Sequence, residues 1–237
     1  MRDPAVAGGN GLRFVYSDER LGRGRIEALD PEGRGGAPED MGDVLAAIPC
    51  FTPETRVLTE RGLVAVDGLS AGDRVVTRDH GSRRVVWSGR RAFGWRELGL
   101  NPLLRPVRIR AGALGEGLPE RDILLSPNHR ILFAARTATG GHDEAFVPAR
   151  DLAGRHGVEI VAPAAVTYVQ LLFDRHEAVL SEGIWSESFL PDPRAVASLG
   201  ERARDAIRGV FGSGAGPSGL TPARPMADAE RIAALAI

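Results

Sequence analysis

The sequence predicts a mostly β protein whose central part, residues 48–190, is an all-β domain. From Cys50 onward, short runs of β-branched and apolar residues recur about every eight to twelve residues, with turn-forming Gly, Asp and Ser between them. A charged, Gly-rich segment precedes these runs, and a pattern of helical period follows them. These observations favour a β sandwich or an irregular barrel with a different type of segment at each end.

The expected strands follow the apolar runs in order. The first are TRVLT, LVAV, RVVT and RRVVWSG, which are separated by the turns ERG, DGLSAGD and RDHGS. Later runs predict strands at 105–110, 121–125, 130–134, 145–147, 158–162, 166–174 and 177–180.

The two ends of the chain depart from this pattern. Residues 1–47 are rich in Gly, Pro and charged residues, so we expect an irregular segment with one short strand at 12–16. Residues 191–212 predict an amphipathic helix, with Asp192 as its cap and Pro193 in its first turn. Its apolar stripe consists of Val196, Leu199, Ala203, Ile207 and Val210. Residues 213–237 are expected to form a flexible tail.

Composition excludes several classes of function. The net charge is −1 and the longest apolar runs fall far short of a membrane span, so we expect neither a nucleic acid nor a membrane as partner. The N-terminus lacks the pattern of a secretory signal, and the compartment stays undetermined. All thirty basic residues are arginine, and the absence of lysine excludes Schiff-base chemistry and a P-loop.

Cys50 is the only cysteine and stands directly after Pro49, where the strand-like sequence begins. A lone cysteine is most often a small buried apolar residue. The five histidines are scattered and no CxxC or HxxxH spacing occurs, so we expect no metal site and no cofactor. Neither a structural nor a metal-binding role explains why the thiol stands at the start of the domain.

The segment from Cys50 to Val57, CFTPETRV, resembles the opening CFTPGTRI of bacterial Hint-domain proteins, with Glu54 in place of glycine. The resemblance continues through residues 66–91, 101–132 and 171–188, so it covers roughly 48–190 in order. The chain is thereby similar to the Hint superfamily of Hedgehog C-terminal regions and inteins. This resemblance implies a horseshoe-shaped all-β domain that processes its own chain.

Such domains perform an N-to-S acyl shift, which here would convert the Pro49–Cys50 peptide bond into a thioester. The family's T-x-x-H motif matches the segment from Ser126 to His129. The resemblance implies that His129 protonates the leaving amide nitrogen and that Ser126 binds the strained amide or the oxyanion. The alternative for His129 is a hydrogen-bonded structural histidine.

A late family motif matches Asp174 and His176 in LLFDRHEAVLSEG. In an extended segment these two side chains would share one face, and either could deprotonate Cys50 or activate the second nucleophile. The alternative is the surface end of a strand. His80, in an expected hairpin turn, is a weaker candidate, and His142 and His156 are expected to be bystanders in polar loops.

Inteins finish by cyclising a C-terminal asparagine that often follows histidine. Here Glu187 and Ser188 occupy those two places, and no asparagine follows Asn128. Side-chain cyclisation is therefore unavailable at this junction. We expect release of the N-terminal segment, which is the domain's own substrate, with water or a small nucleophile as the acyl acceptor.

Three hypotheses remain open from the sequence. The favoured one is self-cleavage at Cys50. The second is a catalytically silent Hint-like fold that serves as a binding or structural module, and the third is a cysteine hydrolase acting on other molecules. Hydroxylamine or a thiol separates them, because only a thioester-forming domain splits into two fragments at Cys50.

Overall fold

The structure is a computed structural model that describes residues 12–18, 23–28, 39–40, 48–136, 142–191, 196, 199, 201–215, 220–228, 230 and 232. Its largest sheet has eight strands in the order β12-β11-β16-β15-β4-β6-β7, with β5 paired to β4. Their bounds are β4 (Arg56–Thr59), β5 (Gly62–Ala65), β6 (Arg74–Thr77), β7 (Gly81–Arg84), β11 (Arg130–Arg136), β12 (His142–Pro148), β15 (Ala178–Ser181) and β16 (Ile184–Glu187).

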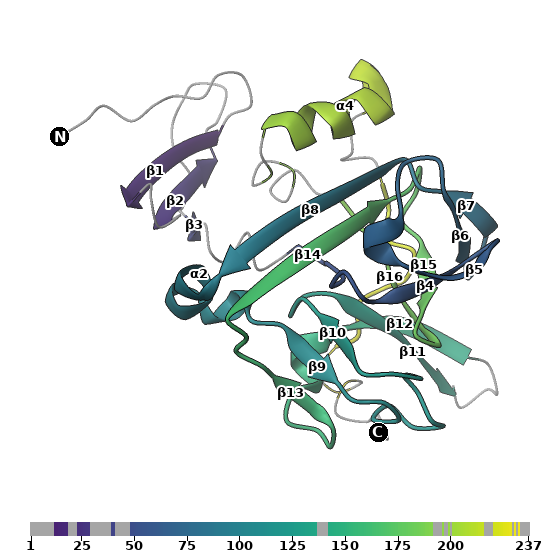
Figure 1. Cartoon of the computed structure of the whole chain (residues 1–237). Coiled ribbons are helices and arrows are strands. Elements are labelled where there is room, and N and C mark those ends of the chain that lie inside the picture. Colours follow the sequence, from purple (N-terminus) through teal and green to yellow (C-terminus); the bar gives the residue numbers. More distant parts are fainter. Residues whose placement is uncertain are drawn as a thin grey trace.

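A long antiparallel ribbon crosses the domain beside this sheet (Figure 1). It consists of β8 (Trp87–Gly94) and β14 (Ala165–Leu172), paired without a bulge along their whole length. A small sheet with the order β10-β9-β13 lies below the ribbon in Figure 1, and its strands are β9 (Val107–Ile109), β10 (Ile123–Leu125) and β13 (Val158–Ile160). Phe51 connects the ribbon to the small sheet, because it pairs with Val169 of β14 and with Leu125 of β10.

The buried apolar side chains of the described residues form two clusters. The first residues of the domain contribute to both. Phe51 belongs to the first cluster, with Leu125 and Val169. Cys50 belongs to the second, with Tyr168 and Leu172. Because successive residues of an extended chain point to opposite sides, one strand-like segment contributes to both clusters. Cys50 thus lies inside the protein.

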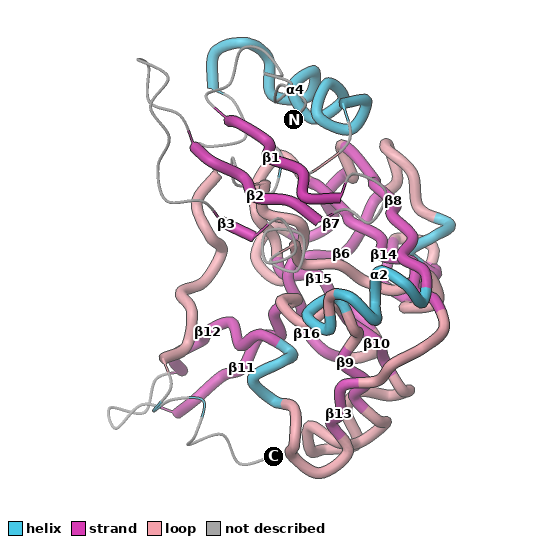
Figure 2. The backbone as a smooth tube through the Cα atoms, turned by 90° about the vertical axis from the view of Figure 1, so that its left-hand side faces the viewer, coloured by secondary structure: helices cyan, strands magenta, loops and turns pink. Residues whose placement is uncertain are grey.

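The mostly β fold class with a C-terminal helix is confirmed, and most expected strands of the domain are present. The exception is RRVVWSG, which was expected as one strand but is divided between β7 and β8. Within the domain, the short helix α2 (Trp95–Leu100) and strand β16 were missed. In the N-terminal segment the expected strand is β1 (Leu12–Asp18), and β2 (Arg23–Ala28) and β3 (Glu39–Asp40) add to it to form a three-stranded sheet. Figure 2 shows this sheet near α4.

The C-terminal helix α4 (Glu201–Ala215) begins later than the sequence suggests. The proposed cap at Asp192 and Pro193 lies outside the described residues. Three positions of the predicted stripe are buried and Ala203 is half-buried, whereas Val210 is exposed. The buried positions are Val196, Leu199 and Ile207. No described helix is long and apolar enough to cross a membrane.

The tail was expected to be flexible, but the structure places residues 220–228 against β12. Phe146 N–H donates to Pro225 O at 2.9 Å, and Ala227 N–H donates to Phe146 O at 3.0 Å. Arg224 binds both carboxylate oxygens of Asp79, at 2.6 and 3.0 Å, and one oxygen of Glu144 at 2.8 Å. This segment therefore covers the outer edge of the eight-stranded sheet.

Arg224→Ala is expected to lower the free energy of unfolding by about 1–2 kcal/mol, because it removes charge-assisted hydrogen bonds to two carboxylates at a partly shielded position. Urea denaturation measures the change. Arg208→Ala is the matched control: its pair with Asp205 on α4 is solvent-exposed, so it should change stability by less than about 0.5 kcal/mol. Equal effects of the two substitutions would contradict a docking role for Arg224.

Candidate active site

Backbone hydrogen bonds hold the segment around Cys50 between β10 and β14. Phe51 N–H donates to Val169 O at 2.9 Å, and Val169 N–H donates back to Phe51 O at 2.8 Å. Ser126 N–H donates to Cys50 O at 3.0 Å from the other side. Only 4% of the surface of Cys50 is exposed. The nucleophile predicted from the sequence therefore lies in a fixed, buried position.

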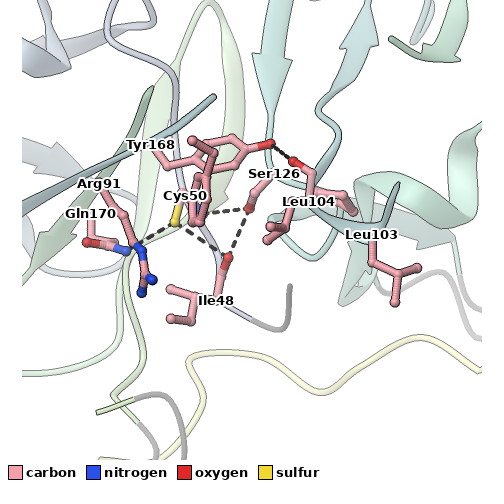
Figure 3. Close-up of a pocket in the computed structure, with 10 residues that line it drawn as sticks. Ile48, Cys50, Arg91, Leu103, Leu104, Ser126, Tyr168 and Gln170 are labelled. Carbon is pink, nitrogen blue, oxygen red and sulfur yellow. Dashed lines mark hydrogen bonds between the residues drawn. The ribbon is translucent and has the colours of Figure 1, made fainter. Parts of the chain in front are cut away.

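The hydroxyl of Ser126 binds the amide that follows Pro49 (Figure 3). Its Oγ accepts a hydrogen bond from Cys50 N–H at 2.8 Å and donates to Ile48 O at 3.0 Å. Ser126 is itself buried. The structure thus brings together Cys50 and Ser126, two of the residues that the sequence singled out, at the nitrogen of the Pro49–Cys50 bond.

The groups around Cys50 Sγ shift the pKa of the thiol in opposite directions. Gln170 Nε2 donates to Sγ at 3.2 Å, and the thiol donates to Ile48 O at 3.5 Å. Burial raises the pKa of the Cys50 thiol to about 12, although hydrogen bonds from Gln170 and Ser126 partly offset this effect. The thiol is therefore protonated at neutral pH.

A pocket with about 310 Å³ of empty space, including its open mouth, lies against Cys50 (Figure 3). Its wall is mostly apolar and includes Phe93, Leu104 and Tyr168, whose hydroxyl donates to Leu104 O at 2.7 Å. Burial raises the pKa of Tyr168, so its hydroxyl stays a donor. Arg91 contributes the positive charge of the pocket wall.

His129 lies on the other side of the nucleophile's segment. Its ring packs against the ring of Phe51, with 4.3 Å between centroids, and it is 1% exposed. Neither ring nitrogen has a hydrogen-bond partner among the described residues. Burial, and then the charges of Arg130 and His176, lower the pKa of His129 to about 3. The imidazole is neutral at pH 7, and the structure does not hydrogen-bond it to the Pro49–Cys50 amide.

His176 and Glu187 form a second buried group. Ala223 N–H, from the docked C-terminal segment, donates to His176 Nδ1 at 2.9 Å, and His176 Nε2 lies 3.3 Å from Glu187 Oε2. Glu187 also accepts from the backbone N–H of Arg130 at 2.8 Å and from its guanidinium at 3.0 Å. Glu187 therefore holds a buried negative charge beside His176, and this charge contributes to the raised pKa of Cys50.

The expectation that Asp174 and His176 share one face is wrong. β14 ends at Leu172 and residues 174–175 form a bend, so the alternation of an extended strand does not apply. Asp174 is exposed and pairs with Arg83 at 2.5 Å, whereas His176 is buried. The structure places Asp174 outside the group of side chains around Cys50.

The other histidines take structural or exposed positions. His80 lies in the turn between β6 and β7, as expected, and its Nδ1 is 2.9 Å from Glu177 Oε2. His156 is exposed, and His142 begins β12 rather than lying in a loop.

Sequence reasoning missed Gln170 and gave Glu187 no role at the site. A signal for Gln170 was present, because it is the only glutamine and the single polar side chain in the apolar run of β14 from Tyr168 to Phe173. A polar residue inside a buried strand needs a partner, and the nearest chemistry in the fold is the thiol.

The comparisons with known proteins agree with this architecture. A family model for the Hint domain matches residues 49–193. A comparison with curated proteins found no match.

Three similar solved structures illustrate the likeness. The gp41-1 intein is 11% identical, with 58% of this chain and 97% of that chain covered and a TM-score of 0.35. An intein-like domain from Clostridium thermocellum is 17% identical, with 59% and 97% covered and a TM-score of 0.36. The AceL NrdHF class 3 split intein is 14% identical, with 59% and 97% covered and a TM-score of 0.39. Because the family model spans more than half of the sequence, this chain belongs to the Hint-domain family.

Proposed function

We propose that this protein cleaves its own chain at the Pro49–Cys50 bond. Cys50 Sγ attacks the carbonyl carbon of Pro49, the new C–S bond replaces the C–N bond, and a thioester results. Water or another small nucleophile then attacks the thioester and releases residues 1–49. The observation that carries the proposal is the 2.8 Å hydrogen bond between Cys50 N–H and Ser126 Oγ, which places a hydroxyl on the leaving nitrogen.

Tethering supplies much of the rate, because the nucleophile and the attacked carbonyl belong to adjacent residues and need no encounter. The proton balance is also internal: the thiol of Cys50 loses a proton, and its own nitrogen gains one as it becomes an amine. Ser126 contacts the nitrogen directly, and it also lowers the pKa of the neighbouring thiol. Its hydroxyl is therefore placed to relay the proton between the two atoms.

We propose that His129 assists protonation of the leaving nitrogen, the role that its motif implies. The support is its match to the family's T-x-x-H motif and its unusual environment, a neutral buried imidazole with no hydrogen-bond partner among the described residues. Leaving such a group unpaired costs about 1–3 kcal/mol, so a purely structural role gives no reason to retain it.

Cleavage should occur only at the N-terminal side of the domain. Ser188 Oγ accepts the backbone N–H of Glu177 at 2.9 Å, and the carboxylate of Glu187 is engaged by Arg130. Neither residue carries an amide side chain that could cyclise. We expect mass spectrometry of the reacted protein to give 1–49 and 50–237. A fragment beginning at Phe189, or a product that joins 1–49 to 189–237, would contradict this account.

One observation favours a second function, a binding or structural module with its chain intact. The resting thiol has a pKa of about 12, and no described side chain that could act as a base lies within hydrogen-bond distance of Sγ. Incubating the purified full-length protein with hydroxylamine separates the two functions. Self-cleavage yields two fragments over time, whereas a module yields none, and a conventional hydrolase turns over added substrate without cutting itself.

A further inference from the structure

Gln170 is a polar side chain in an apolar environment. It is 3% exposed, and its neighbours on the same face of β14, Tyr168 and Leu172, belong to the apolar cluster that contains Cys50. Burying an amide without a partner costs about 1–3 kcal/mol, so its presence here requires a compensating contact. That contact is the sulfur: Nε2 lies 3.2 Å from Cys50 Sγ and donates to it (Figure 3).

The neighbouring strand leaves room for this amide. Gln170 pairs across the ribbon with Gly89 of β8. A Cβ atom at Gly89 would lie 2.7 Å from Gln170 Oε1 and 2.0 Å from the Trp87 ring, both closer than such atoms approach in proteins. Any side chain at this position would therefore displace the Gln170 amide or the indole. Glycine at position 89 thus leaves the space in which the Gln170 amide reaches Cys50 Sγ.

We infer that Gln170 is a catalytic residue that orients Cys50 Sγ and stabilises the negative charge that develops on it before attack. A neutral amide suits this task because its N–H bonds more strongly to a thiolate than to a thiol. The amide cannot accept the thiol proton, which leaves proton transfer to other groups. Arg91 lies two residues beyond Gly89 on β8, and its positive charge favours the thiolate in the same way. This role rests on the proposed self-cleavage.

Gln170→Met is the most direct test. Methionine is about as long as glutamine, but it is apolar and has no N–H donor. The apolar cluster around position 170 should accept it. Two rates are measured at pH 8 on the full chain: alkylation of Cys50, the only cysteine, by iodoacetamide, and cleavage by hydroxylamine. We expect both to fall about tenfold, the effect of losing one hydrogen bond to a charged group.

Gln170→Glu provides a second variant of nearly unchanged shape. Its carboxylate would oppose the thiolate, so both rates should fall by more, about a hundredfold. Thr167→Val, on the same strand but outside the pocket wall, is the control and should leave both rates within about twofold of the unchanged protein. Far-UV circular dichroism confirms that each variant is folded.

The outcomes separate the two claims. If the unchanged protein cleaves and Gln170→Met alkylates and cleaves at the same rates, the role of Gln170 is overturned while self-cleavage stands. If Gln170→Met slows alkylation but no variant, including the unchanged protein, cleaves, then self-cleavage fails. Gln170 would in that case be a contact of the thiolate and not a catalytic residue.

Discussion

Cys50→Ala is expected to abolish cleavage completely, because the chain contains no other thiol and the attacked bond lies beside this one. Hydroxylamine at any pH between 7 and 10 should leave the Pro49–Cys50 bond of the variant intact. The variant should remain folded, because the removed sulfur lies at the edge of a pocket rather than in the centre of the larger apolar cluster. Fragment yield by gel and thermal melting measure the two properties.

The pH dependence of cleavage in the unchanged protein tests the role of Cys50 in a second way. Reaction requires the thiolate, and the pKa of Cys50 is about 12, so the thiolate fraction rises about tenfold for each pH unit across the range 7 to 10. The cleavage rate should rise with it. A rate that levels off near pH 8.5, where an ordinary thiol titrates, would show that the buried thiol described here is not the reacting species.

His129→Leu is expected to have opposite effects on activity and on acid stability. Loss of the acid–base group should slow cleavage by roughly 10²–10⁴-fold. The pKa of His129 is about 3 in the folded protein, against about 6.5 in the unfolded chain. The folded state therefore disfavours protonation, so this contribution to stability is complete above pH 6.5 and is lost as the pH falls towards 3.

Over that window the unchanged protein should lose about 5 kcal/mol through His129, roughly 1.4 kcal/mol per pH unit. His129→Leu removes this term, so the difference in unfolding free energy between the two proteins should shift in favour of the variant from pH 6.5 downward. Urea denaturation at pH 7, 5 and 4 measures it. His156→Leu, at an exposed position, is the control and should change neither property. Unchanged cleavage in His129→Leu would remove His129 from the mechanism.

The sequence predicted the strands of the domain well, because their signal is local. Apolar runs such as RVVT and RILF, with turn residues on either side, become β6 and β11. Strand β1 was expected from its apolar residues, but β2 and β3 were not, since RGRIEA and ED are mostly charged or glycine. The docking of residues 220–228 was missed for another reason: it depends on hydrogen bonds from a distant strand, which composition does not reveal.

The sequence predicted the part of the site that a motif defines, but not the part that depends on how the backbone turns or pairs. The segment that contains Ser126 brought its hydroxyl to the amide of Cys50 because it ends β10, which pairs with the start of the domain. Asp174 and His176 were expected together, but a bend separates their side chains. Gln170 reaches Sγ only through the register of β14 beside Cys50, and that register is a property of the folded sheet.

The central claim is that the bond between Pro49 and Cys50 becomes a thioester, and one measurement tests it most directly. The purified full-length protein is treated with hydroxylamine, and the products are analysed by intact-mass and tandem mass spectrometry. A thioester yields residues 1–49 with a hydroxamate on the carboxyl carbon of Pro49, together with residues 50–237 carrying a free N-terminal Cys50. An uncut Pro49–Cys50 bond would contradict the account, whereas a cut at Asn10–Gly11 is the ordinary reaction of hydroxylamine with an Asn–Gly bond and does not bear on it.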